Sequence, residues 1–120
     1  MKTISIKGKD YVTVAERIKE FNSKYPNGCI TTELVSAPDA DRAVIKATVI
    51  PDVAISSRIF TGYSQATKGD GMVNKNAWLE NADTSAVGRA LGMMGIGLVD
   101  SLASADEMKK AGAWDDVAPF

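Results

Sequence analysis

The sequence contains no histidine and only one cysteine, and both shortages limit the chemistry open to the chain. Without histidine it lacks the commonest general base, the commonest metal ligand and every triad of the Ser-His-Asp type. Cys29 has no partner for an internal disulfide, so a reducing cytosol is the expected compartment. We therefore predict a protein that is not an enzyme, with no catalytic residue, no metal site and no cofactor.

Long apolar runs and an excess of charge of either sign are also missing. No apolar run approaches the roughly eighteen residues that span a membrane, and the N-terminal MKTISIKGKDY lacks the apolar core of a secretory signal. The formal net charge of −1 gives no whole-chain argument for a nucleic-acid partner. At 120 residues, 45% of them hydrophobic, the chain is expected to form one domain around a single core.

What is present favours an α+β fold with the helices on one face of an antiparallel sheet. Hydrophobic periodicity and turn residues predict an N-terminal hairpin, a helix, a three-stranded sheet, a long helix and a short helix. Two Ser/Thr-x-x-Glu capping boxes, at 13–16 and 104–107, mark the starts of the first and last helices. The expected strands are 3–6 and 11–12 in the hairpin and 29–35, 42–50 and 57–66 in the sheet, and the long helix covers 81–97 with Asn74 or Asn76 as a possible cap.

Alternation in the expected strand 42–50 assigns its two faces. Ala43, Ile45, Ala47 and Val49 share one face, and Arg42, Val44, Lys46 and Thr48 share the other. In the first helix, Val14, Ile18, Phe21 and Tyr25 form the apolar side, and Arg17, Lys19, Glu20 and Lys24 are interpreted as a solvated surface.

The segment 81–97, NADTSAVGRALGMMGIG, is the centre of the expected fold. Its apolar face consists mostly of alanines and is flanked by Gly88 and Gly92, each of which costs roughly 1 kcal/mol against alanine in a helix. Such a helix is expected to use its small residues to lie close to the sheet. Its lone cation, Arg89, lies off the apolar line, beside any groove between helix and sheet.

The region from Arg42 to Lys75 carries five cations and two acids, a balance of +3. Cations that follow a phosphate backbone and aromatic rings that stack on bases are typical of sequence-tolerant single-strand binding. The residues predicted to bind DNA are Lys46, Arg58, Tyr63, Lys68, Lys75, Trp78 and Arg89.

Two other motifs are interpreted as structural. The GxxGxG at 92–97 ends a helix, whereas a dinucleotide fingerprint begins one, so helix termination is the expected role. Glu80 and Asp83, three residues apart, could form an acid pair for metal-dependent hydrolysis, but first-turn acids usually complement the helix dipole.

The C-terminal WDDVAPF resembles the acidic tip of bacterial single-stranded DNA-binding proteins. In that resemblance Asp115, Asp116, Pro119 and Phe120 would bind partner proteins, the terminal carboxylate pairing with a basic pocket rim. The block 73–108, above all ENADTSAVGRAL, GIG and ASADE, together with KDYVTVAERIKEFNSKYPNG and ITTELV, resembles phage single-stranded DNA-binding and single-strand annealing proteins of the Sak, Erf and Rad-fifty-two group.

These resemblances imply a phage protein with a β-β-β-α core, active in replication or recombination in the host cytoplasm. We expect 1–112 to be one globular domain that binds single-stranded DNA without sequence preference and self-associates, and 113–120 to be a tip that recruits replication or recombination proteins. An annealing recombinase that pairs strands in rings is the alternative, and a metal-dependent hydrolase is the weaker one. Gly88 and Gly92 stand where that group carries further basic residues, which favours binding over annealing.

Overall fold

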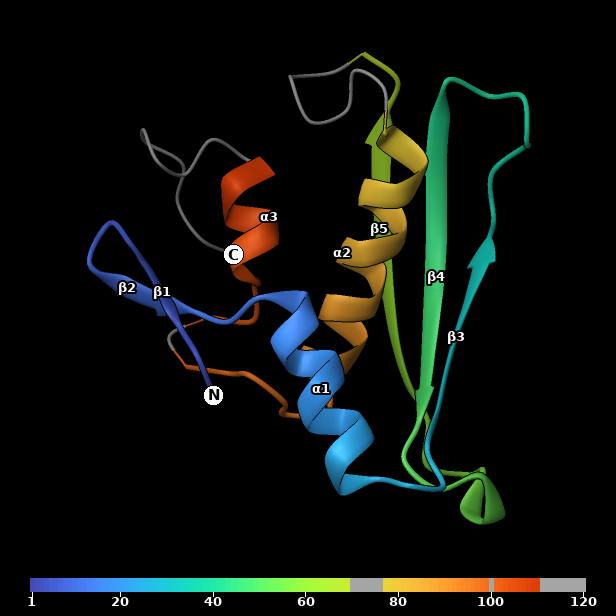
Figure 1. Cartoon of the computed structure of the whole chain (residues 1–120). Helices are drawn as coiled ribbons and strands as arrows, with labels where there is room; N and C mark the ends of the chain where they lie inside the picture. Colours follow the sequence, from blue (N-terminus) through green and yellow to red (C-terminus); the bar gives the residue numbers. More distant parts are fainter. Residues whose placement is uncertain (70–76, 100, 111–120) are drawn as a thin grey trace.

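The chain forms an α+β fold in which helices cover one face of a three-stranded antiparallel sheet, as predicted (Figure 1). The computed structural model describes residues 1–69, 77–99 and 101–110. Its elements are β1 (Ile4–Ile6), β2 (Lys9–Tyr11), α1 (Val14–Lys24), β3 (Cys29–Leu34), β4 (Arg42–Ile50), the 3-10 helix η1 (Val53–Ile55), β5 (Phe60–Thr67), α2 (Trp78–Met93) and α3 (Ala105–Lys110).

The sheet has the order β3-β4-β5, and both strand pairs are antiparallel. The predicted strand 42–50 is confirmed, but the predicted start of the third strand at residue 57 is wrong, because β5 begins at Phe60. The intervening residues turn instead, since the Asp52 carboxylate accepts the Ala54 amide at 2.9 Å and caps η1. Arg58 therefore lies in a connection and not in a strand.

Burial alternates along β4 and separates the two faces of the sheet. Ala43, Ile45, Ala47 and Val49 are buried on the side of α1 and α2, as predicted. The opposite face has no helix over it in the described part of the chain, and Figure 1 shows α1 and α2 on the same side of the strands. We call this uncovered side the open face.

Helix α2 lies very close to β5 because Gly62 has no side chain. A Cβ at residue 62 would lie 2.5 Å from the Ala90 nitrogen and 2.6 Å from the Ala86 oxygen, closer than side chains tolerate. The alanines of α2 thus face the sheet. Gly88 and Gly92 are used elsewhere, since Cβ atoms there would meet Val14 of α1 at 2.7 Å and Leu102 at 2.7 Å.

The ends of α2 differ in part from the expectation. The helix begins at Trp78 after Ala77, which caps it without a side-chain hydrogen bond, so the predicted asparagine cap is wrong. It stops at Met93 and not at Gly97. Gly95 and Gly97 adopt positive φ angles of 98° and 75°, which only glycine takes without strain, and this confirms their predicted role in ending the helix.

The predicted caps of the two shorter helices are confirmed. Thr13 accepts the Glu16 amide at 3.2 Å at the start of α1. At α3 the Ser104 hydroxyl accepts the Glu107 amide at 3.2 Å, and the Glu107 carboxylate accepts the Ser104 amide at 3.5 Å. Asp106 of α3 also accepts the Val14 amide at 2.8 Å, so α3 caps α1 across 92 residues of sequence.

The hairpin β1-β2 and helix α3 pack together into a second, smaller apolar cluster beside the main core. Its buried members are Ile6, Tyr11, Ala103, Ala105 and Met108. None of the helices that the structure describes combines the length and apolar character needed to cross a bilayer. The predicted DNA contact Lys75 and the predicted tip 113–120 lie outside the described residues.

Candidate functional site

The open face of the sheet presents an exposed aromatic ring beside a cation. Tyr63 of β5 is 55% exposed and lies directly opposite Lys46 of β4 in the strand register. Alternation along the strands explains this, because residues paired across β4 and β5 point to the same face. The structure thus brings together two of the seven residues predicted from the sequence to bind DNA.

Polar side chains surround this pair on the same face. Arg42 and Thr67 are paired at one end of the β4–β5 ladder, and Gln65 lies opposite Val44 between that end and Tyr63. A shallow hollow next to Tyr63 is lined by Val44, Ser64 and Gln65. On the β3 side of Lys46 lies Glu33, so this face carries two cations and one acid.

Lys68 and Trp78 form a second predicted pair at the end of β5. The Lys68 Nζ lies 5.3 Å from the centroid of the Trp78 ring, within the range of a cation–π contact. Trp78 is partly buried and packs against the core, and strand rise places Lys68 about 17 Å along the chain from Tyr63. This pair is therefore separate from the Lys46–Tyr63 pair.

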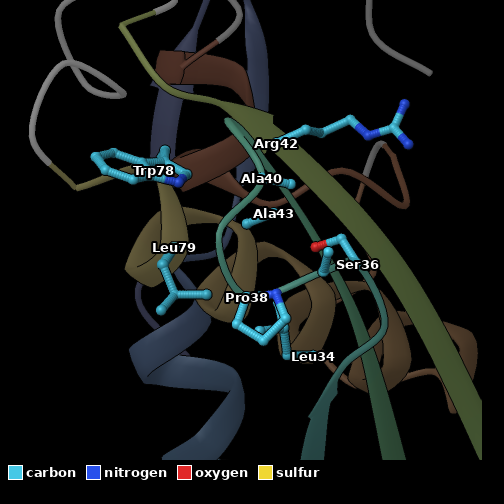
Figure 2. A pocket seen from close by; sticks show the side chains of 9 residues that line it. Leu34, Ser36, Pro38, Ala40, Arg42, Ala43, Trp78 and Leu79 are labelled. Carbon is cyan, nitrogen blue, oxygen red and sulfur yellow. The ribbon is translucent and has the colours of Figure 1, made fainter.

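Trp78 also borders a small cavity between the β3–β4 connection and the start of α2 (Figure 2). Most of its lining is apolar, with Leu34, Pro38 and Leu79 facing the hollow. Figure 2 shows the guanidinium end of Arg42 extending away from these side chains, which agrees with its place on the open face.

Arg58 lies at the other end of β5, in the connection from β4. Its guanidinium carbon is 5.2 Å from the centroid of the Phe60 ring. Phe60 packs partly against the core on the helix side of the sheet, so Arg58 is directed toward that side.

Arg89 pairs with an acid and is not part of the open face. Its Nη1 lies 3.4 Å from the Glu107 carboxylate of α3, and the side chain is 29% exposed. The sequence placed Arg89 beside a groove between helix and sheet, whereas the structure places it between α2 and α3. Its contact with DNA stays a prediction.

Next to this ion pair lies Arg17, whose interpretation as a solvated residue is wrong. Its side chain is fully buried, and its guanidinium donates to the carbonyl oxygens of Gly88 at 2.6 Å, Leu102 at 3.2 Å, and Gly97 and Ala103 at 3.3 Å. Burial lowers the pKa of Arg17, while the nearby carboxylates of Glu107 and Asp106 act in the opposite direction.

The sequence contained a signal for this burial. Arg17 follows Val14 by three residues and precedes Phe21 by four, which places all three on the same stripe of α1. The sequence interpretation assigned Arg17 to the solvated surface because of its charge, although its position places it on the buried stripe.

Glu80 and Asp83 lie in the first turns of α2 and are not joined by further metal ligands. Within the described residues, no three His, Cys, Asp or Glu side chains are grouped so that they could hold a metal ion. The hydrolase alternative gains no support from this arrangement.

The seven predicted DNA contacts therefore fall into separate places. Lys46 and Tyr63 share the open face, Lys68 and Trp78 lie at one end of β5, Arg58 lies at the other, Arg89 faces α3, and Lys75 is outside the described residues. Arg42 and Gln65 were missed as candidates, although strand alternation had already put Arg42 on the face of Lys46.

Comparison with known families corrects the origin inferred from the sequence. The model of the family described as Slr1353 N-terminal dsRNA-binding domain-like matches residues 18–94. That span runs from α1 through β3, β4 and β5 to the end of α2, an α-β-β-β-α unit. Searches of the curated proteins and of the solved structures find no match.

The resemblance to phage proteins of the Sak, Erf and Rad-fifty-two group is therefore wrong. It rested on sequence blocks within 9–35 and 73–108 and on a β-β-β-α order, which is only part of the five-element unit observed. With it, annealing in rings and a place in phage recombination lose their basis. The matched family points to nucleic acid in general as the class of ligand. Since the match covers well over half of the sequence, the chain belongs to the Slr1353 N-terminal dsRNA-binding domain-like family.

Proposed function

We propose that the chain binds single-stranded nucleic acid, without strong sequence preference, on the open face of its sheet. The observation that carries the proposal is the exposed Tyr63 directly opposite Lys46 on a face that none of the described helices covers. An aromatic ring stacks on any base, because every base has a π-face, and a neighbouring cation pairs with the phosphate. The family assignment supports nucleic acid as the ligand class.

Polar neighbours extend this surface along β4 and β5. Arg42 supplies a second cation, and Gln65 supplies an amide that can donate to or accept from a base edge. Lys68 and Trp78, a separate pair beyond the end of β5, are further predicted contacts. Contacts from Arg58, Lys75 and Arg89 are further predictions of the same proposal.

The helix side of the sheet is a poorer place for phosphates. On α1, Lys19 lies 3.9 Å from Glu16 and Lys24 lies 3.4 Å from Glu20, so both cations already have acidic neighbours. Arg89 pairs with Glu107, and Arg17 is buried. The charge balance of the open face, +1 from Arg42, Lys46 and Glu33, therefore favours that face.

Double-stranded RNA is a second candidate ligand, favoured by the description of the family. Proteins recognise such duplexes through A-form shape and through contacts with 2′-hydroxyls and phosphates, not by stacking on bases. The two candidates therefore differ in how much binding depends on Tyr63.

The test is a fluorescence-anisotropy titration of labelled single-stranded DNA, single-stranded RNA, duplex DNA and duplex RNA at several salt concentrations. Tyr63→Ala is expected to weaken single-strand binding roughly five- to a hundredfold, because a stacked base is lost, and Tyr63→Phe is expected to retain it. The logarithm of the single-strand binding constant falls linearly with the logarithm of the salt concentration. Lys46→Gln should make this slope shallower by about 0.7, because one phosphate contact is lost. Lys19→Gln on α1 is the matched control and should leave both quantities unchanged.

Two outcomes would contradict the proposal. Tighter binding of duplex RNA than of single strands, with no effect of Tyr63→Ala, would select the second candidate. Weak binding of all four nucleic acids that does not change with salt would reject a nucleic-acid ligand.

Recruitment of partner proteins through residues 113–120 is a separate prediction. It needs Asp115, Asp116 and Phe120, and a partner with a basic rim around an apolar pocket. Deletion of 113–120 tests it, since any captured partner should then be lost while binding at Tyr63 remains.

A further inference from the structure

Strand β3 forms an edge of the sheet, and the described chain places no strand beyond it (Figure 1). The Val35 amide donates to the Val44 carbonyl oxygen at 2.8 Å, so Val35 and Val44 form a hydrogen-bonded pair. Along β3, residues that bond β4 therefore alternate with residues that do not, counted from Val35. Residues 29, 31, 33 and 35 therefore direct their backbone groups toward β4. Ile30, Thr32 and Leu34 direct theirs outward, away from the sheet.

This edge lacks the features that normally prevent strands from pairing between molecules. Such features include proline, lysine, bulges and very short strands. Residues 29–35 read CITTELV, without proline, glycine or lysine, and Glu33 is their only charge. Leu34 is 38% exposed and Val35 is 53% exposed, so apolar surface accompanies the open backbone groups.

We infer that β3 pairs antiparallel with β3 of a second copy of this chain across a two-fold axis at Thr32. The outward backbone groups of residues 30, 32 and 34 would then bond those of residues 34, 32 and 30 of the partner. The two sheets become one six-stranded sheet in the order β5-β4-β3-β3-β4-β5.

The sequence of the edge is complementary to itself in this register. Thr32 lies opposite its own copy, and Ile30 lies opposite Leu34, an apolar pair on the helix side. On the open face Thr31 lies opposite Glu33, and Cys29 lies opposite Val35. Every apolar residue meets an apolar one, and no charge meets a like charge.

Neighbouring registers are poorer. A shift that puts the axis at Glu33 places two carboxylates directly opposite each other, which is destabilising. A shift that puts the axis at Thr31 sets Ile30 against Thr32 and Cys29 against Glu33. Pairing of residues 29–35 with the same residues of the second copy is therefore most favourable when the axis lies at Thr32.

The other edge of the sheet fits a second copy less well. By the same alternation, β5 directs outward the backbone of Thr61, Tyr63, Gln65 and Thr67, whose side chains lie on the open face. None of these four side chains is aliphatic, and Lys68 follows the strand. At β3, exposed aliphatic side chains lie beside the outward backbone groups. Strand pairing at β3 would therefore remove more apolar surface from water than strand pairing at β5.

Sedimentation velocity of the full chain over a concentration series, without nucleic acid, tests the inference. We expect a monomer–dimer equilibrium with no larger species. Thr32→Pro should abolish the dimer, because it removes the central outward N–H while leaving the β3–β4 ladder its bonds. Circular dichroism of this variant verifies that it folds.

A pair of charge variants tests the register itself. Thr31→Lys puts a cation opposite the partner's Glu33 at two symmetric positions and should lower the dimer Kd about threefold to tenfold. Thr31→Glu should raise it by a similar factor. Thr61→Lys and Thr61→Glu, at the same face on the other edge, are the matched controls and should not alter Kd.

Three results would overturn the inference. The first is a monomer at every concentration, for the wild type and for Thr31→Lys alike. The second is a dimer that is insensitive to residues 31 and 32. The third is open-ended assembly that responds to Thr61, since pairing of β3 with β5 of another copy generates filaments or rings instead of a closed dimer.

Discussion

At the scale of single residues, Arg17 holds together parts of the chain that are distant in sequence. Its guanidinium donates to backbone carbonyls of α2, of the segment after α2 and of the residues that precede α3. Gly88 lies within α2, whereas Gly97, Leu102 and Ala103 lie outside the described helices, where a carbonyl has no intrahelical donor. One buried cation thus replaces several donors that the backbone cannot provide.

Replacing Arg17 by methionine should destabilise the fold by about 3 kcal/mol or more, because the guanidinium bonds to the carbonyls of Gly88 and Ala103 are lost in a buried place. Arg17→Lys should also be destabilising, since an ammonium cannot reproduce the planar fork. Urea unfolding monitored by circular dichroism measures both. Lys19→Met, two residues along α1 with a 76% exposed side chain, is the control and should change stability by less than about 0.5 kcal/mol. Wild-type stability in Arg17→Met would contradict this role.

At the scale of secondary-structure elements, small residues set the distance between α2 and the sheet. Ala86 and Ala90 of α2 are fully buried against β5 at Gly62. The second small-residue face of the helix, Gly88 and Gly92, accommodates α1 and Leu102. Packing on two sides thus stabilises a helix that carries two interior glycines, and burial offsets their low helix propensity.

Gly62→Ala should destabilise the fold by about 1–3 kcal/mol, because the added methyl meets backbone atoms of α2 at 2.5 and 2.6 Å and these cannot move independently. Thermal or urea unfolding checks this, with Thr61→Ser at the neighbouring exposed position as the control. An unchanged midpoint for Gly62→Ala would show that α2 can shift without loss of packing.

At the scale of the whole molecule, the residues that the family model matches and the segments that flank them form different parts of the fold. The matched residues 18–94 form the helix–sheet layers, while the hairpin β1-β2 and α3 form the second cluster. The two parts meet where Asp106 caps α1 and where Glu107 pairs with Arg89. Arg89 is thereby engaged on the side of α2 that faces α3, and the open face is left to Arg42, Lys46 and Tyr63.

The net charge of the whole chain predicts that the acidic residues 113–120 weaken its binding of nucleic acid. Deleting 113–120 removes Asp115 and Asp116 and changes the formal net charge from −1 to +1. Single-strand affinity should then increase, because less negative charge competes with the nucleic acid for the cations of the sheet. Anisotropy titration at low salt measures the change, and a full-length variant with Asp115→Asn and Asp116→Asn separates charge from length. Unchanged or weaker binding in both would refute the competition.

Much of the fold was predictable because it depends on local pattern. The strand 42–50 and its two faces follow from alternation, and both capping boxes follow from side chains that bond backbone donors three residues away. The end of α2 is less well fixed by local signals, since Gly88 and Gly92 lie within the helix and only Gly95 and Gly97 follow it.

The candidate site was predictable only in part, for a physical reason. Lys46 and Tyr63 could be named from residue type, but their direct opposition depends on the register of two strands separated by a connection. Arg89 could also be named from residue type, but the structure pairs it with an acid, because α3 docks where Glu107 reaches it. A charged residue has the same identity on a surface, in an ion pair or in the core, and only its neighbours in space distinguish these roles.

The sequence by itself determined the order of the elements, the two faces of β4, and the caps of α1 and α3, because these depend on neighbours within a few residues. The tertiary structure alone decided that Arg17 is buried, that Arg89 faces α3, and that the described helices all lie on one side of the sheet. Those features arise from contacts between segments up to 92 residues apart, which hydrophobic periodicity does not encode.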